Sequence, residues 1–243
     1  MKKLTLEDWH SKNSWMLKFE KYLPEVLYGS MDGIVTTFAV VAGSAGADLT
    51  INIILILGVS NLLADGLSMS IGSYLSKKSE QDNYNKHAKI EAWEIDNMPD
   101  IERQEVIDIY KAKGFEGHEL DIVVNRITSN KQVWLDTMMK DELGLMPEKK
   151  SPFRSGVSTF LSFVAAGGIP LIVYLLAYAG KLGINPFILS SAITLLAFIL
   201  IGYIKTYVTQ IGLWRSILET LILGASAATA AYLLGDYLEK ILR

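Results

Sequence analysis

The sequence from residue 51 to residue 75 is Ile51-Asn-Ile-Ile-Leu-Ile-Leu-Gly-Val-Ser-Asn-Leu-Leu-Ala-Asp-Gly-Leu-Ser-Met-Ser-Ile-Gly-Ser-Tyr-Leu75. Apart from Asp65 it is long and apolar enough to cross a bilayer, which requires about 20 such residues in a helix. A carboxylate at that depth is costly and normally faces a partner, a water path or an ion. The segment therefore predicts a transmembrane helix that lines a pathway.

Four further apolar stretches have the length of a membrane-spanning helix. The first of them carries a second acid, Asp32, near its start. The alternative to a pathway is that Asp32 and Asp65 form a polar pair that only locks two helices together. We expect an all-α integral membrane protein with five transmembrane helices, the other four lying at residues 26–47, 156–179, 184–204 and 216–234.

Charged residues are concentrated in one hydrophilic block. Half of the 243 residues are hydrophobic and 20% are charged, but more than half of the 26 acids and of the 23 Lys and Arg residues lie between Lys77 and Lys150. We therefore expect four segments: an N-terminal arm (1–25), helices 1 and 2 (26–76), a helical insertion (77–153) and helices 3 to 5 (154–243).

The distribution of Lys and Arg predicts the orientation. The arm and the insertion are rich in both, whereas the connections near Asp48 and Gly180 are poor in them. The positive-inside rule then places the N-terminus and the insertion in the cytoplasm. The net charge of −3 does not favour a nucleic-acid partner. The chain has no cysteine, so neither disulfides nor thiolate metal ligands are expected.

Within the insertion, acids recur at helical spacing between turn signals at residues 97–99, 113–114 and 129–130. Glu91 and Glu94 are three residues apart, as are Glu102 and Glu105. Carboxylates at this spacing on facing helices build divalent-metal sites, and thioethers beside them favour softer ions. A third helix adds Met138, Met139 and Glu142. The alternatives are a solvated acidic face for the glutamates and ordinary core packing for the methionines.

Two positional patterns concern the spans. On the second span, Asn61, Asp65 and Met69 share one helical face, so Met69 is a candidate soft ligand beside Asp65, although a methionine alone is usually a packing residue. On the first span, Gly29 and Gly33 form a small-xxx-small pattern. We expect this pattern to bring two first spans together across a dimer axis.

Three motifs carry a resemblance to a known family. They are Gly29-Ser-Met-Asp-Gly-Ile-Val-Thr-Thr-Phe-Ala-Val-Val-Ala-Gly-Ser-Ala-Gly46, Asn61-Leu-Leu-Ala-Asp-Gly-Leu-Ser-Met-Ser-Ile-Gly-Ser-Tyr-Leu-Ser-Lys-Lys-Ser-Glu80 and Trp134-Leu-Asp-Thr-Met-Met-Lys-Asp-Glu-Leu-Gly-Leu145. Together they resemble the vacuolar iron transporter family. The similarity runs from about Val26 to the C-terminus and is strongest before Glu80.

The resemblance implies a homodimer that exports Fe²⁺, and often Mn²⁺, from the cytoplasm in exchange for protons, with no enzymatic activity and no organic cofactor. By position, Asp32 and Met69 match residues of the family's translocation path. The cytoplasmic metal ligands are matched by Glu91, Glu94, Glu102, Glu105, Met138, Met139 and Glu142. The chain departs from the plant pattern at Asn61, where a membrane Glu is replaced and the acid lies one turn later at Asp65, and at Met31, a position that is often Asn.

The residue patterns also fit two other functions. A membrane-anchored, ferritin-like iron-binding protein is an alternative, but ferritin-like sites use Glu-x-x-His pairs and the insertion has none. A metal sensor or scaffold that does not transport is a third possibility. The residue types accommodate both Fe²⁺ and Mn²⁺. A bacterial plasma membrane and a vacuole-like organelle membrane would both suit the topology.

Overall fold

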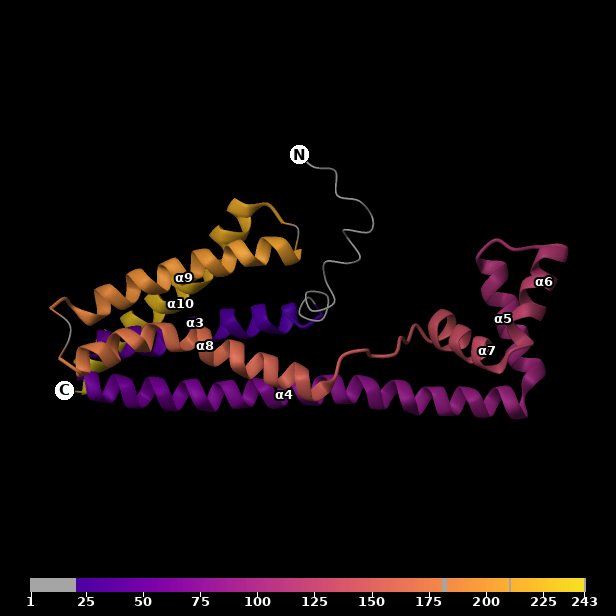
Figure 1. Cartoon of the computed structure of the whole chain (residues 1–243), viewed down its shortest axis with the longest axis horizontal. Helices are drawn as coiled ribbons and strands as arrows, with labels where there is room; N and C mark the ends of the chain where they lie inside the picture. Colours follow the sequence, from indigo (N-terminus) through magenta and orange to yellow (C-terminus); the bar gives the residue numbers. More distant parts are fainter. Residues whose placement is uncertain (1–20, 181–182, 210, 243) are drawn as a thin grey trace, which may run out of the picture. The chain divides into compact units, whose positions relative to one another are not determined.

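The computed structural model describes residues 21–180, 183–209 and 211–242, so most of the expected N-terminal arm lies outside the described residues. Across the described ranges the chain is helical and forms no strand. This confirms the all-α prediction. Labelled as in Figure 1, the elements are α3 (Leu23–Gly46), α4 (Ile51–Asn97), α5 (Pro99–Ala112), α6 (Gly117–Thr128), α7 (Lys131–Thr137), the π-helical turn η1 (Met138–Glu142), α8 (Pro152–Tyr178), α9 (Pro186–Thr209) and α10 (Leu213–Leu242).

Five of these helices, namely α3, α4, α8, α9 and α10, are long and apolar enough to cross a membrane, which confirms the predicted number of spans. Proline occupies the first turn of α3 and of α8, where its missing N–H is not needed. The short connection between α3 and α4 contains Asp48 with φ 50°, a left-handed conformation that Asp tolerates better than most residues.

The second span does not end at the edge of the apolar stretch. Helix α4 has 47 residues, which corresponds to about 70 Å at the usual rise per residue. The hydrocarbon core of a bilayer is only about 30 Å thick, so much of this helix lies outside it. The chain divides into two compact units, residues up to 75 with residues 150–243, and residues 76–149. We call the first the membrane unit and the second the insertion unit.

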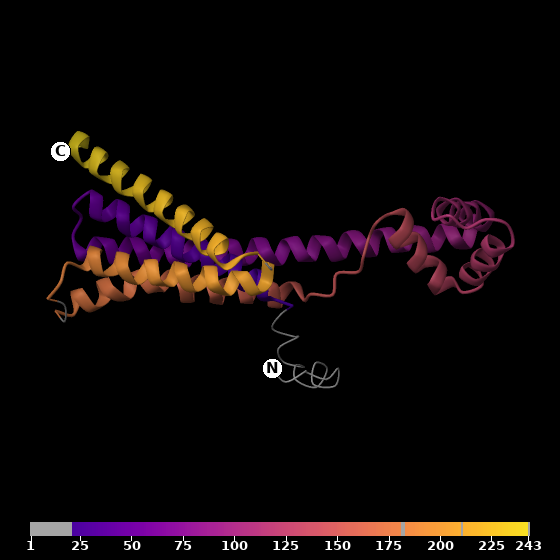
Figure 2. The ribbon, with the colours of Figure 1, turned by 90° about the horizontal axis from the view of Figure 1, so that it is seen from above.

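In the membrane unit, α3 is the central helix and packs against α8, α9 and α10. Both Figure 1 and Figure 2 show α9 running alongside α8. The buried side chains between the helices include Phe38 and Val41 of α3 and Phe163 of α8. Because α3 is enclosed by three neighbours, its side chains can reach several helix interfaces.

The glycine pattern of α3 has a different role from the predicted one. A Cβ on Gly33 would lie 2.9 Å from the Cα of Phe163, and a Cβ on Gly29 would lie 2.7 Å from the backbone O of Thr159. Both of these partners belong to α8 of the same chain. The prediction that Gly29 and Gly33 face a dimer axis is therefore wrong, because the close approach that these glycines permit is already used within the chain.

The insertion unit has its own small apolar core, formed by the end of α4 with α5, α6 and α7. Its helices end where the turn signals predicted, at Asn97, Ala112 and Thr128. The side chain of Asn130 caps α7 by accepting hydrogen bonds from the backbone N–H groups of Gln132 and Val133. The buried core residues are Ile95, Val106, Leu120, Val124, Ile127, Trp134 and Met138.

Candidate metal centre

Three carboxylates of the insertion unit converge on one small volume. Glu91 and Glu94 lie three residues apart on α4 and therefore project from the same side of that helix. Glu102 lies in the first turn of α5, just after the turn at residues 97–99. One oxygen from each of the three lies within 4.8 Å of the other two. Ligand oxygens on opposite sides of a divalent cation are about 4–5 Å apart, so this spacing fits a shared ion.

Two of these acids each have one buried carboxylate oxygen without a hydrogen-bond partner. Glu91 and Glu102 are each 4% exposed. Among the described residues nothing donates to Oε1 of Glu91 or to Oε2 of Glu102. A buried carboxylate oxygen without a donor is strongly destabilising, and a bound cation would remove that penalty. A solvated acidic face, the alternative raised above, does not describe these two side chains.

The environment of the cluster also shifts its titration. The pKa of Glu91 is raised to about 8, first because the side chain is buried and then because it hydrogen-bonds to Glu102 and is repelled by neighbouring carboxylates. Burial is likewise the main reason that the pKa values of Glu102 and Glu142 are raised. Glu91 therefore retains a proton near neutral pH, and a cation that binds at the cluster displaces it.

The remaining predicted ligands of the insertion lie on α5 and η1. The charge of Glu105 raises the pKa of both Glu102 and Glu142, so the structure brings all three acids into one electrostatic group. Met138 is 0% exposed and Met139 is 1% exposed. Both belong to η1, which packs against α5. Glu142, at the end of η1, is partly open to solvent, so the burial that raises its pKa is only partial.

The membrane unit contains a second group of acids. Asp32 of α3 and Asp65 of α4 are close enough for their charges to interact. The Nδ2 of Asn61 donates a hydrogen bond to Oδ2 of Asp65 at 2.7 Å. Asp32 also lines a cavity of about 610 Å³ between α3 and α10, together with residues such as Met31 and Ser226. The structure thus brings the two predicted membrane acids together and gives one of them a donor.

Met69, the predicted soft ligand of the second span, is half-buried and packs against the apolar core that contains Phe163. This contact is compatible with ordinary packing. Its role as a metal ligand therefore stays a prediction.

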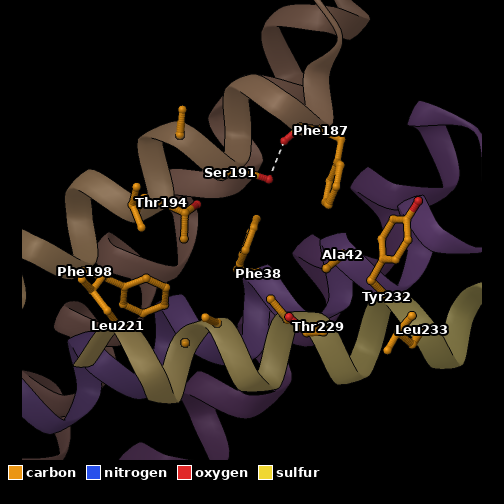
Figure 3. Close-up of a pocket in the computed structure, with 15 residues that line it drawn as sticks. Phe38, Ala42, Phe187, Ser191, Thr194, Phe198, Leu221, Thr229, Tyr232 and Leu233 are labelled. Carbon is orange, nitrogen blue, oxygen red and sulfur yellow. Dashed lines mark hydrogen bonds between the residues drawn. The ribbon is translucent and has the colours of Figure 1, made fainter. Parts of the chain in front are cut away.

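Figure 3 shows a different cavity, of about 480 Å³, between α3, α9 and α10. Phe38, Phe187 and Tyr232 project toward its interior, and the hydroxyl of Ser191 donates to the backbone O of Phe187 instead of remaining free. None of the residues lining it is acidic. The acids that could bind a cation are therefore not part of this apolar cavity.

Sequence reasoning missed some of the partners of these acids. The hydrogen bond from Asn61 to Asp65 joins residues four apart on one helix, a spacing that the sequence displays. The ion pair of Lys113 with Asp141, 2.6 Å long, joins α5 to η1 and has no comparable local signal. Contacts between separate helices are the part that the spacing of residues does not reveal.

The described residues define a class of protein: a multi-pass helical membrane protein with acids inside its spans and a separate acid cluster in a compact insertion. Ionisable residues within spans mark ion or proton pathways in such proteins.

Comparison with known proteins identifies the family. The profile described as VIT family matches residues 23–236. Vacuolar iron transporter 1 of Tulipa gesneriana is 38% identical over 218 residues, covering 89% of this chain and 87% of the relative. Vacuolar iron transporter 1 of Arabidopsis thaliana is 35% identical over 238 residues, covering 98% of this chain and 93% of the relative. The vacuolar iron transporter of Toxoplasma gondii is 31% identical over 228 residues, covering 90% of this chain and 75% of the relative.

The chain belongs to the VIT family, which confirms the resemblance found in its motifs. These relatives are named as transporters and not as enzymes, in agreement with the prediction that this chain is not an enzyme.

Proposed function

We propose that this protein transports divalent transition-metal ions, Fe²⁺ and/or Mn²⁺, out of the cytoplasm in exchange for protons. The observation that carries the proposal is the pair of buried carboxylates, Glu91 and Glu102, each with one oxygen that has no hydrogen-bond donor among the described residues and that a cation would satisfy, in a chain of the VIT family. The relatives named vacuolar iron transporters support iron as one substrate.

The insertion unit collects the ion in this proposal. Carboxylate oxygens bind Fe²⁺ and Mn²⁺ alike, and their number sets the affinity. Thioethers add a preference for the softer of the two ions. We assign these tasks to two sets of side chains, the carboxylates Glu91, Glu94, Glu102, Glu105 and Glu142 and the thioethers Met138 and Met139.

The membrane unit then moves the ion. Asp32 and Asp65 bind it within the spans, with Met69 as a candidate third ligand. A carboxylate binds either a cation or a proton at one oxygen, so protons entering from the far side release the ion. The same competition returns protons to the cytoplasm when the next ion binds. Exchange of this kind needs acids that alternate between the two partners, and the spans supply two of them.

We further propose that the N-terminus and the insertion are cytoplasmic, as their Lys and Arg content suggests. A homodimer is the assembly that the resemblance implies, but its interface must use a surface other than the Gly29 and Gly33 face, which α8 occupies. A bacterial plasma membrane and a vacuole-like membrane both accommodate this arrangement.

Uptake into proteoliposomes with an imposed pH gradient tests the proposal. We expect Fe²⁺ under reducing conditions, or Mn²⁺, to enter faster with the gradient than without it, and a protonophore to abolish the difference. Mg²⁺ serves as a comparison ion because it is harder and dehydrates reluctantly. Folded protein that binds Fe²⁺ but gives no uptake would instead support a membrane-anchored iron-binding protein without transport.

A further inference from the structure

The turn η1 is unusual and carries three of the proposed ligands. Its backbone N–H at Leu143 donates to the O of Met138 at 3.1 Å, the five-residue step of a π-helix. Such turns are rare and occur frequently at functional sites. A rare backbone conformation persists only where surrounding contacts enforce it. The contacts that η1 makes therefore indicate what holds it.

The π turn has a consequence for the two methionines. Consecutive side chains of a regular α-helix point about 100° apart, so one of the two commonly turns toward solvent on a helix at the surface. Met138 and Met139 are nevertheless both buried, with 0% and 1% exposure. The wider turn thus keeps two adjacent thioethers inside the insertion unit.

One ion pair ties this turn to the helix that carries two of the glutamates. Asp141 of η1 accepts from Nζ of Lys113 at 2.6 Å, and the Asp141 side chain is only 20% exposed. Lys113 is the C-cap residue of α5, the helix with Glu102 and Glu105. Its Nζ also lies 4.6 Å from the centre of the Tyr110 ring. A cation at a helix C-terminus is favourable in its own right.

We infer that Lys113 and Asp141 are positioning residues whose ion pair holds η1 in its π conformation and so presents Met138 and Met139 to a cation held by the glutamates. The inference rests on the proposed metal-collecting role of the insertion unit. Lys113 also neutralises Asp141, which keeps this acid from competing with the adjacent Glu142 for the cation. Because thioethers favour softer ions, the pair governs the preference for Fe²⁺ over Mn²⁺.

The test is metal binding to the purified full-length protein, with Fe²⁺ under anaerobic conditions and with Mn²⁺. Asp141→Asn removes the charge and nearly keeps the shape. We expect it to weaken Fe²⁺ binding about fivefold, the upper range for a pair that is partly exposed, and Mn²⁺ binding less. The matched control is Asp82→Asn, which breaks the exposed 2.7 Å pair with Lys78 in the same unit and should change neither affinity.

A reversed pair, Lys113→Asp/Asp141→Lys, should restore the ratio of Fe²⁺ to Mn²⁺ affinity, which a general loss of structure would not do. An unchanged ratio in Asp141→Asn, or no recovery in the reversed pair, overturns the inference. If Asp141→Asn loses helix content, the result for the reversed pair is the one that tests the inference. If the unaltered protein binds neither ion, the collecting role fails and the inference fails with it. Equal binding by the unaltered protein and Asp141→Asn refutes the inference alone.

Discussion

The acids of the insertion unit and those of the membrane unit are surrounded differently. Glu91 and Glu102 are buried, and neither Oε1 of the first nor Oε2 of the second has a donor among the described residues. Asp65, by contrast, accepts a hydrogen bond from Asn61, and Asp32 borders an open cavity. A buried carboxylate oxygen without a donor is stabilised mainly by a proton or a cation, whereas a hydrogen-bond donor satisfies such an oxygen without either. This difference matches the proposed division of roles, in which the insertion unit holds the ion and the membrane unit exchanges it for protons.

The largest effect is expected when ion exchange in the membrane unit is removed while ion binding in the insertion unit is left intact. We expect Asp32→Asn to abolish metal uptake, because the amide can neither carry the negative charge nor exchange a proton. Binding to the glutamate cluster should remain unchanged in the same protein. Uptake into liposomes and metal binding in detergent measure the two separately.

The control for that experiment is Asp48→Asn in the connection between α3 and α4. This acid is exposed and has φ 50°, which Asn adopts as readily as Asp. Uptake should therefore be unaffected. If Asp32→Asn took up metal as fast as this control, Asp32 would be excluded from the translocation path.

The converse experiment removes a holding ligand. Glu102→Gln should weaken metal binding by at least about tenfold, the lower range seen when even an indirect partner of a metal ligand is lost. Uptake at saturating metal should be changed little, since the membrane acids are intact. The metal concentration for half-maximal uptake is the readout. The exposed Glu119→Gln, on α6 of the same unit, is the matched control and should behave like the unaltered protein.

The sequence predicts the features of the two units that depend on neighbouring residues. It does not predict those that depend on contacts between residues far apart along the chain. The five spans and the helical insertion follow from apolar runs and from acids at steps of three and four, which are local patterns. The helix that packs against Gly29 and Gly33 cannot be predicted in this way, because a small-xxx-small face fits any closely approaching helix. The structure gives them α8, where the sequence suggested a second copy of α3. The π turn is also not visible in the sequence, and its ion pair with the end of α5 joins residues that are far apart along the chain.

The two units also differ in what makes them stable, and Gly33→Ala tests that difference. The added Cβ would lie 2.9 Å from the Cα of Phe163, so α3 and α8 must separate slightly. Overpacking of this kind costs about 1–3 kcal/mol. We expect a lower midpoint of thermal unfolding in detergent and unchanged metal binding by the glutamate cluster. Gly168→Ala, whose Cβ would meet nothing within 4 Å, is the control. Equal midpoints for the two variants would contradict the packing role.

The smallest effect we expect is the dependence of metal affinity on pH. It tests metal binding by the glutamate cluster without any substitution in the membrane spans. Because the pKa of Glu91 is raised to about 8, this side chain carries a proton at pH 6 when no metal is bound. A metal ion must displace that proton, so affinity should rise about tenfold per pH unit between pH 6 and 8 and level off above. Glu91→Gln should remove this slope as well as weaken binding. An affinity independent of pH over this range would mean that Glu91 is already ionised in the free cluster.

The same shift has the opposite effect on stability without metal. The folded state binds this proton more tightly than the unfolded chain, in which the carboxyl has its ordinary pKa of 4.5. The stabilisation from this proton is therefore complete below about pH 4.5 and is lost as the pH rises through about 8. We expect the metal-free protein to unfold at a lower temperature at pH 8.5 than at pH 6, and added Mn²⁺ to reverse that order by binding the ionised cluster. A cluster stabilised by its own donors, as at Asp65 and Asn61, would not show such a reversal.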